Sequence, residues 1–210
     1  MIVTLIVAGL IAFVSGIIIL MGMEPVGLSF NAYAIWHRKQ WYRLITYSFV
    51  HGSWRHLIYN MVWVLGLGFY LNERLVGRHE LLGEFVDEWI YYLMIISYYI
   101  GAIVFSTLGD LLIYKDNPNF NAVGASGIVA ALLFTCLLLS DPTDTVPVFY
   151  VGVKVWIFAI LFLIYCIYMT MAQIANIGHT SHLCGAIYGF FAPCLINPHL
   201  LVDFFSKLFS

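Results

Sequence analysis

Long apolar runs alternate with short polar stretches along the chain, and this pattern predicts a bundle of helices. About 20 apolar residues suffice for a helix to cross the hydrocarbon core of a bilayer. By that criterion the sequence predicts six membrane spans, at residues 2–21, 55–71, 89–108, 126–139, 148–172 and 182–195. No internal repeat or linker interrupts the pattern, so residues 1–210 are predicted to form a single domain.

The composition supports a membrane protein. Of the 210 residues, 62% are hydrophobic and only 10% are charged, whereas soluble domains have roughly 45–50% and about 25%. The fold class predicted is therefore an all-α, multi-pass membrane protein. A net charge of −2 without a basic cluster gives no reason to expect a nucleic-acid partner. The four cysteines lie in apolar segments without CxxC spacing, so we expect neither a disulfide framework nor a zinc site.

The first predicted loop, residues 23–54, is rich in tryptophan and tyrosine interleaved with cations. This composition is typical of the membrane–water interface. We expect the loop to be embedded in that interface beside the bundle; the alternative is an ordinary extramembrane loop. Lysine and arginine are spread almost evenly over the two sides of the predicted bundle, so the positive-inside rule does not orient the chain.

Three of the predicted spans begin with polar residues, which are costly within a membrane and therefore candidates for function. The second span opens with His56 and Asn60, which are four residues apart and share one helix face, and His51 precedes them. The fourth span opens with Ser126 and the sixth with His182. Alternate spans run in the same direction, so these polar residues are predicted to lie on one side of the membrane at similar depth.

Ser126 is consistent with two interpretations. Small residues are typical of helix–helix contacts in membranes, and a serine hydroxyl is a nucleophile when a base removes its proton. Histidine is the usual base because its pKa lies near neutrality. His182 is followed by Gly185 and Gly189, a spacing that permits close helix contact, and Gly127 provides a small residue on the fourth span. We therefore predict a dyad of Ser126 and His182.

A serine nucleophile also requires donors for the oxyanion that forms during attack. The side chains of His56 and Asn60 and the backbone N–H of Ser126 are the candidates. His179, three residues before His182, is the alternative base.

Metal or haem ligation is the other interpretation of these histidines. No acidic or thiolate ligand accompanies them, and that interpretation leaves the asparagine and the serine unexplained, so we predict neither metal nor cofactor. No carboxylate falls within the spans near His182, which favours a dyad over a triad. Asp110 and Asp116, in the loop on the same side, are the exceptions.

From about Trp41 onward the chain resembles the rhomboid intramembrane serine proteases in their basic six-helix form. The resemblance rests on these motifs, in the order of the family: Trp41 and Arg43; His51, His56 and Asn60; Glu73, Arg74 and Gly77; Gly124-Ala125-Ser126-Gly127; and His182, Gly185 and Gly189. Any one motif is weak evidence, but their order and their positions on the expected spans are specific.

The resemblance implies that Ser126 is the nucleophile and His182 the general base. It implies that His56, Asn60 and the Ser126 amide form the oxyanion hole, which Gly124 helps to shape. The fold implied is a six-helix bundle around a short fourth helix, with the site at the floor of a water-filled cavity. The substrates implied are transmembrane segments of other proteins within the lipid bilayer. The location implied is the plasma (bacterial inner) membrane, with a cytoplasmic N-terminus and an exoplasmic site. The natural substrate and the oligomeric state are not defined.

The chain departs from the family pattern in two places. Many members carry a tyrosine that stacks on the base where this chain has Ala130, so we expect Tyr188 or Tyr165 to hold the imidazole instead. Trp41 also stands two residues before Arg43, where the commoner pattern has the two adjacent. Neither change removes a reacting group, which favours an enzyme over an inactive relative that only binds membrane segments.

Overall fold

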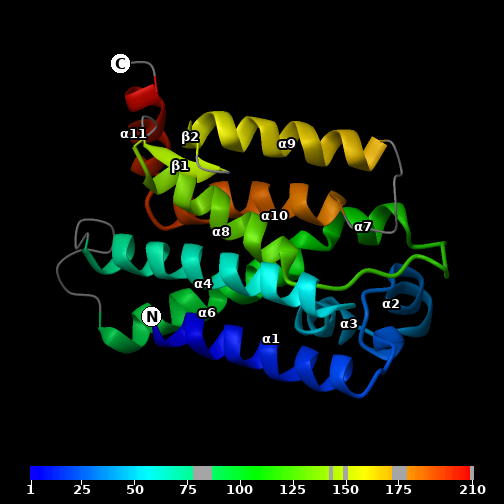
Figure 1. Ribbon diagram of the computed structural model, residues 1–210. Helices are drawn as coiled ribbons and strands as arrows, with labels where there is room; N and C mark the ends of the chain where they lie inside the picture. The colour runs from blue at the N-terminus through cyan, green and yellow to red at the C-terminus, as the bar shows by residue number, and fades with distance from the viewer. Residues whose placement is uncertain (78–86, 142–143, 149–150, 172–178, 209–210) are drawn as a thin grey trace.

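The computed structural model describes residues 1–77, 87–141, 144–148, 151–171 and 179–208. Six helices form the body of the molecule: α1 (Ile2–Leu20), α4 (Trp54–Gly77), α6 (Glu88–Ser106), α8 (Ser126–Leu139), α9 (Val155–Met171) and α10 (His179–Phe191). They lie side by side, and α4, α8 and α10 run in the direction opposite to α1, α6 and α9 (Figure 1). The first residues of α4, α8 and α10 therefore meet at one end of the bundle.

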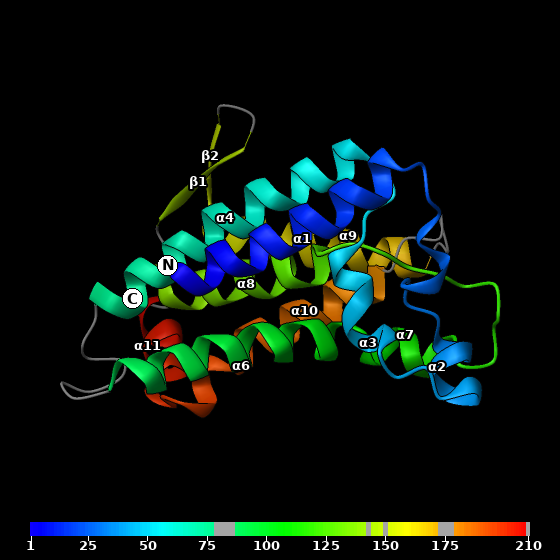
Figure 2. The same ribbon diagram turned by 90° about the horizontal axis from the view of Figure 1, so that it is seen from below.

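Shorter elements cover the two ends of the bundle (Figure 2). The elements near the start of α8 are η1 (Pro25–Gly27), α2 (Ala32–Arg38), α3 (Arg43–Thr46), η2 (Tyr47–Phe49) and α7 (Leu108–Ile113). The elements at the opposite end are an antiparallel hairpin of β1 (Thr145–Val148) and β2 (Val151–Lys154), then η3 (Pro193–Leu195) and α11 (His199–Leu208).

Three of the main helices match the predicted spans to within two residues, and three differ. Helix α4 continues to Gly77, beyond the predicted end of its span at residue 71, because residues 72–77 include no proline and several good helix formers. The span predicted to start at 148 begins instead with the hairpin, and its helix starts at Val155. Helix α10 starts three residues early and ends before Pro193, which cannot continue a helix. The stretch between the predicted spans 148–172 and 182–195 lies in part outside the described residues.

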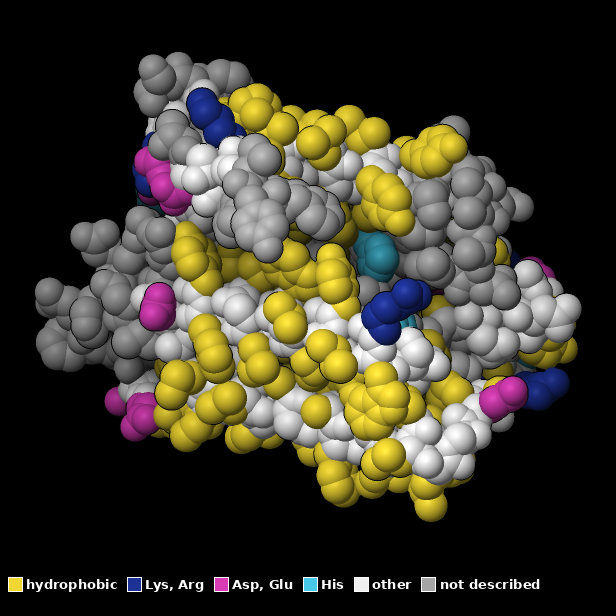
Figure 3. Space-filling model, viewed as in Figure 1, with side chains coloured by type: hydrophobic (Ala, Val, Ile, Leu, Met, Phe, Trp, Pro, Cys, Tyr) yellow, Lys and Arg dark blue, Asp and Glu magenta, His cyan; other side chains and the backbone are white. Residues whose placement is uncertain are grey.

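Two helical segments of the described chain are long and apolar enough to cross a membrane by themselves, namely 2–20 and 88–113. A third apolar segment, 180–195, meets the segment 199–208 at a bend of 115°. Large hydrophobic side chains are also exposed over much of the surface (Figure 3), as expected for helices in contact with lipid. These features are those of a helical membrane protein.

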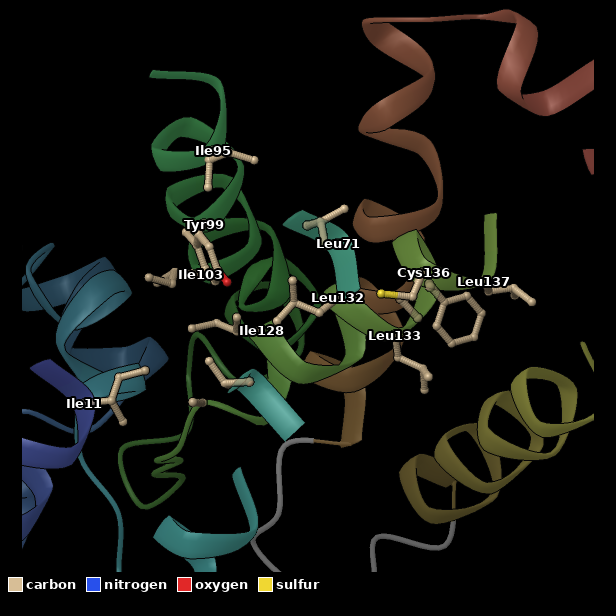
Figure 4. Close-up of a cluster of buried hydrophobic side chains, with 14 of the residues drawn as sticks. Ile11, Leu71, Ile95, Tyr99, Ile103, Ile128, Leu132, Leu133, Cys136 and Leu137 are labelled. Carbon is tan, nitrogen blue, oxygen red and sulfur yellow. The ribbon is translucent and has the colours of Figure 1, made fainter. Parts of the chain in front are cut away.

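Helix α8 is the centre of the molecule. Nearly all of its side chains from Gly127 to Leu139 are buried, so the helix is apolar on every side. Helices α4, α6 and α10 pack against it, and Leu71 of α4 and Ile95, Tyr99 and Ile103 of α6 belong to the same buried cluster as its side chains (Figure 4). With 14 residues, α8 is about 21 Å long, whereas the hydrocarbon core is about 30 Å thick. A helix of this length is too short to reach both surfaces of a membrane.

Glycines bring α10 against α8. A Cβ atom on Gly185 would overlap the carbonyl oxygen of Gly127, and one on Gly189 would overlap the backbone of Ala131. The Thr135 hydroxyl of α8 donates a 2.6 Å hydrogen bond to the carbonyl of Gly189 and so joins the same two helices. This contact fixes the start of α10 beside the start of α8.

Candidate active site

Ser126 and His182 are in direct contact. Ser126 is the first residue of α8, and His182 lies in the first turn of α10. Nε2 of His182 lies 2.7 Å from Oγ of Ser126, within the range a base needs to take a proton from a hydroxyl. His179, the alternative base, is the first residue of α10, but its side chain lies outside the described part of the structure.

The pair lies in a pocket of about 500 Å³ between α4 and α9. Apolar and aromatic side chains form most of its wall: Tyr59, Trp63 and Leu67 of α4, and Phe158, Phe162 and Tyr165 of α9. In the space-filling view, histidine is visible in the hollow between these two helices (Figure 3). The pocket thus gives an apolar, side-facing approach to a polar floor.

Hydrogen-bond donors surround Ser126. His56 and Asn60 line the same pocket, as predicted from their spacing on one helix face. One N–H of the Asn60 amide donates to the carbonyl of His56 at 3.0 Å, and the amide carries a second N–H. The first N–H groups of α8, including that of Ser126, have no partner within the helix. Three kinds of potential donor therefore line the pocket that holds the serine.

Gly124 presses the loop before α8 against His56. Its φ of +115° is a conformation that side chains with a Cβ rarely adopt. A Cβ there would lie 2.7 Å from Cε1 and 2.8 Å from Nε2 of the His56 ring. The N–H of Gly124 donates to the carbonyl of Tyr47 at 3.0 Å, which ties this loop to η2. Glycine is thus required for the close approach that sets the position of His56.

His51 lies behind the site and supports the start of α8. Its ring is fully buried and packs edge-on against His56, with 4.8 Å between the centroids. Nε2 accepts the N–H of Ala125 at 3.2 Å, while Nδ1 lies 2.8 Å from Oγ of Ser15. The Ser15 hydroxyl donates to the carbonyl of Phe49 at 2.8 Å. The hydroxyl must therefore accept from Nδ1, and this network assigns a neutral ring with its proton on Nδ1.

Burial, with a smaller contribution from nearby His56, lowers the pKa of His51 to about 3. A lowered pKa agrees with the hydrogen bonds, because a proton on Nε2 would face the Ala125 N–H. Both ring nitrogens are occupied, so His51 is available neither to an oxyanion nor to a metal. His51 therefore supports Ala125 and, through Ala125, the neighbouring Ser126.

Two of the other predicted supporting motifs lie away from the pocket. The buried guanidinium of Arg43 donates to the carbonyls of Val26 and Ser29, both at 2.7 Å, and thereby closes the first loop. Glu73 is exposed in the last part of α4, far along that helix from the site. The side chain of Arg74 lies outside the described residues.

Phe162 of α9 is an aromatic side chain placed beside the imidazole of His182. The ring centroids lie 6.2 Å apart with an angle of 36° between the planes. Of the two tyrosines proposed for this place, Tyr165 lies on the pocket wall, whereas Tyr188 stacks on Phe105 with centroids 5.0 Å apart and does not line the pocket. The prediction for Tyr188 was wrong. The sequence did not mark Phe162, because it is one phenylalanine among many in an apolar run.

The fold and this pairing define the class of the protein: a helical membrane protein with a serine and a histidine hydrogen-bonded at its centre. Comparison with known proteins makes the class specific, because a family model of the rhomboid domain matches residues 38–198. The chain belongs to the rhomboid family. It is also similar to Rhomboid-like protein 15 of Arabidopsis thaliana, with 28% identity over 165 residues. This match covers 75% of the present chain and 37% of the length of that relative.

Proposed function

We propose that this protein is an intramembrane serine endopeptidase that hydrolyses peptide bonds in transmembrane segments of other proteins. The observation that carries the proposal is the 2.7 Å contact between Nε2 of His182 and Oγ of Ser126 at the start of α8. A serine at a helix start is both exposed to a pocket and surrounded by free backbone N–H groups. Family membership supports the same conclusion.

In the proposed reaction His182 takes the hydroxyl proton of Ser126 while the serine oxygen attacks the substrate carbonyl. His56, Asn60 and the Ser126 N–H stabilise the oxyanion of the tetrahedral intermediate. His182 then gives its proton to the departing amine, which leaves an ester on Ser126. Water, deprotonated by His182, attacks this ester and releases the second product with the serine restored.

The pocket suggests how the substrate arrives. Its walls of aromatic and aliphatic side chains lie between α4 and α9, so a transmembrane segment enters sideways from the bilayer. A helical segment hides its carbonyls in hydrogen bonds, and for this reason we propose that substrates carry helix-breaking residues near the cleavage site. The short α8 holds the serine below the membrane surface, where water reaches it through the pocket.

We further propose that six helices cross the membrane, with the N-terminus cytoplasmic and the site opening to the exoplasmic side of a plasma (bacterial inner) membrane. The exposed Trp36, Trp41 and Tyr42 of the first loop suit the membrane–water interface. Cations lie over neighbouring rings there, as with Lys39 on Trp41 at 5.8 Å. These contacts support a position of the first loop beside lipid headgroups.

Cleavage of a membrane-embedded substrate in proteoliposomes tests the proposal. The substrate is a single transmembrane segment with glycine and proline near one end, and its fragments are counted by mass spectrometry. The wild type is expected to cut it, Ser126→Ala and His182→Ala are expected to be inactive, and His179→Ala is the matched histidine control. Equal fragment levels from the wild type and Ser126→Ala would identify an inactive relative that only binds membrane segments. Activity lost in His179→Ala but kept in His182→Ala would reassign the base.

A further inference from the structure

We propose that Asp110 is a positioning residue for His182, an inference that rests on the proposed function. The sequence places Asp110 in a loop, but the structure places it in α7, fully buried against the first turn of α10. Its Oδ2 accepts a 2.6 Å hydrogen bond from the hydroxyl of Ser181, the residue immediately before His182. Through Ser181, Asp110 fixes the direction in which the imidazole leaves the helix.

The contact between α7 and α10 is close enough to hold this geometry. A Cβ on Gly109 would overlap the Thr180 side chain and would lie 2.9 Å from Sγ of Cys184. The backbone of α7 therefore rests directly on the first turns of α10. Thr180 and Ser181 are themselves buried, so this part of α10 is packed against its neighbours, and Ser181 also lines the pocket beside His182.

Helix geometry converts the Ser181 bond into a position for His182. Successive residues of an α-helix are about 100° apart around the axis. With the Ser181 side chain held against α7, the next side chain turns toward α8, where Ser126 lies. A first turn rotated by a few tens of degrees would carry the imidazole nitrogen away from the 2.7 Å contact that proton transfer needs.

The location of the carboxylate is also favourable. Negative charge near a helix N-terminus interacts well with the free N–H groups and the dipole of the helix. A buried carboxylate is costly unless hydrogen bonds satisfy it. Oδ1 of Asp110 is buried without a hydrogen-bond partner among the described residues, so the bond from Ser181 to Oδ2 is the one whose loss leaves this carboxylate unheld. The surface carboxylate of Asp116, by contrast, pairs with His37 at 3.0 Å and is 71% exposed. Asp116 is therefore a matched control in the same connection between α6 and α8.

A double-mutant cycle tests the proposal in the detergent-solubilised protein. Asp110→Ala, Ser181→Ala, the double variant, Asp110→Asn and Asp116→Ala are compared with the wild type for kcat and KM on the transmembrane substrate. We expect each single alanine to lower kcat about 10- to 100-fold with KM nearly unchanged, and the double variant to lose no more than either. Asp110→Asn, whose amide oxygen accepts the same bond, is expected to recover most of kcat, and Asp116→Ala to equal the wild type.

The proposal would be overturned if the fold-loss of kcat in the double variant were the product of the two single losses. It would also be overturned if Ser181→Ala had the kcat of the wild type. Ser181→Ala keeps the test valid if Asp110→Ala does not fold. If the wild type cleaves nothing, the proposed function fails, and a readout without activity decides the inference. This readout is the imidazole NMR signal of His182 in histidine-labelled protein, assigned by its loss in His182→Ala. Asp110→Ala and Ser181→Ala are expected to shift it alike; an unchanged signal in both would refute the positioning role.

Discussion

Replacement of His51 by glutamine should reduce the decrease in the free energy of unfolding of this protein as the pH falls. The folded ring is neutral, with its Nε2 accepting the N–H of Ala125 and its proton shared with Ser15. Burial lowers its pKa from 6.5 to about 3. Glutamine provides an amide oxygen that can accept the same N–H but does not titrate. His51→Gln therefore separates the hydrogen bond from the protonation.

The sign and size of the effect follow from linkage. Between pH 6.5 and 3 the unfolded chain binds a proton at His51 that the folded chain excludes, so lowering the pH favours the unfolded state. The free energy of unfolding falls by about 1.4 kcal/mol per pH unit in this window. Between pH 7.5 and pH 4.5 the wild type should lose about 2–3 kcal/mol more stability than His51→Gln.

The measurement is reversible unfolding in mixed micelles, followed by far-ultraviolet circular dichroism at several pH values from 7.5 to 4.5. Ser15→Ala is the control, because it breaks the same network but keeps the buried, titrating ring: its stability should be lower at every pH, with the slope of the wild type. Parallel pH curves for the wild type and His51→Gln would refute the neutral, buried role assigned to His51.

Two further predictions concern packing and catalysis. Gly189→Ala should destabilise the fold by about 1–3 kcal/mol, because its Cβ would overlap the backbone of Ala131. In the same unfolding assay Gly66→Ala, whose Cβ would meet nothing within 4 Å, should be neutral or slightly stabilising; equal losses in both would contradict the close helix contact. Asn60→Ala should lower kcat about ten- to a thousandfold through loss of one oxyanion donor, measured on the transmembrane substrate with helix content unchanged; a wild-type kcat would remove Asn60 from the oxyanion hole.

Much of the arrangement of the main helices could be predicted from the sequence, because apolar runs of membrane length are a strong signal. The boundaries of α8 agree at both ends, since the glycine-flanked serine and the polar residues after Leu139 mark them clearly. The direction of the helices then places His56, Ser126 and His182 at one end. That geometry depends only on the order of the helices and needs no side-chain detail.

The parts that the sequence did not predict depend on contacts between distant segments. The hairpin before α9 has valines that suit a membrane span as well as a strand, so hydrophobicity alone misassigned Val148 and residues 151–154. Helix α11 was missed because its apolar residues are interrupted by charges and it is too short for a span. Asp110 was placed in a loop, because the residues next to it in the sequence give no sign that α10 buries it. Such a carboxylate is identified only when its partner is in place.

The most direct test of the account is whether Ser126 is an activated nucleophile. A fluorophosphonate probe is added to the detergent-solubilised wild type, Ser126→Ala and His182→Ala, and the labelled peptide is identified by mass spectrometry. The phosphonate is expected on Ser126 of the wild type, and neither variant is expected to be labelled. A folded wild type that does not react, or that carries the label on another serine, would contradict the account.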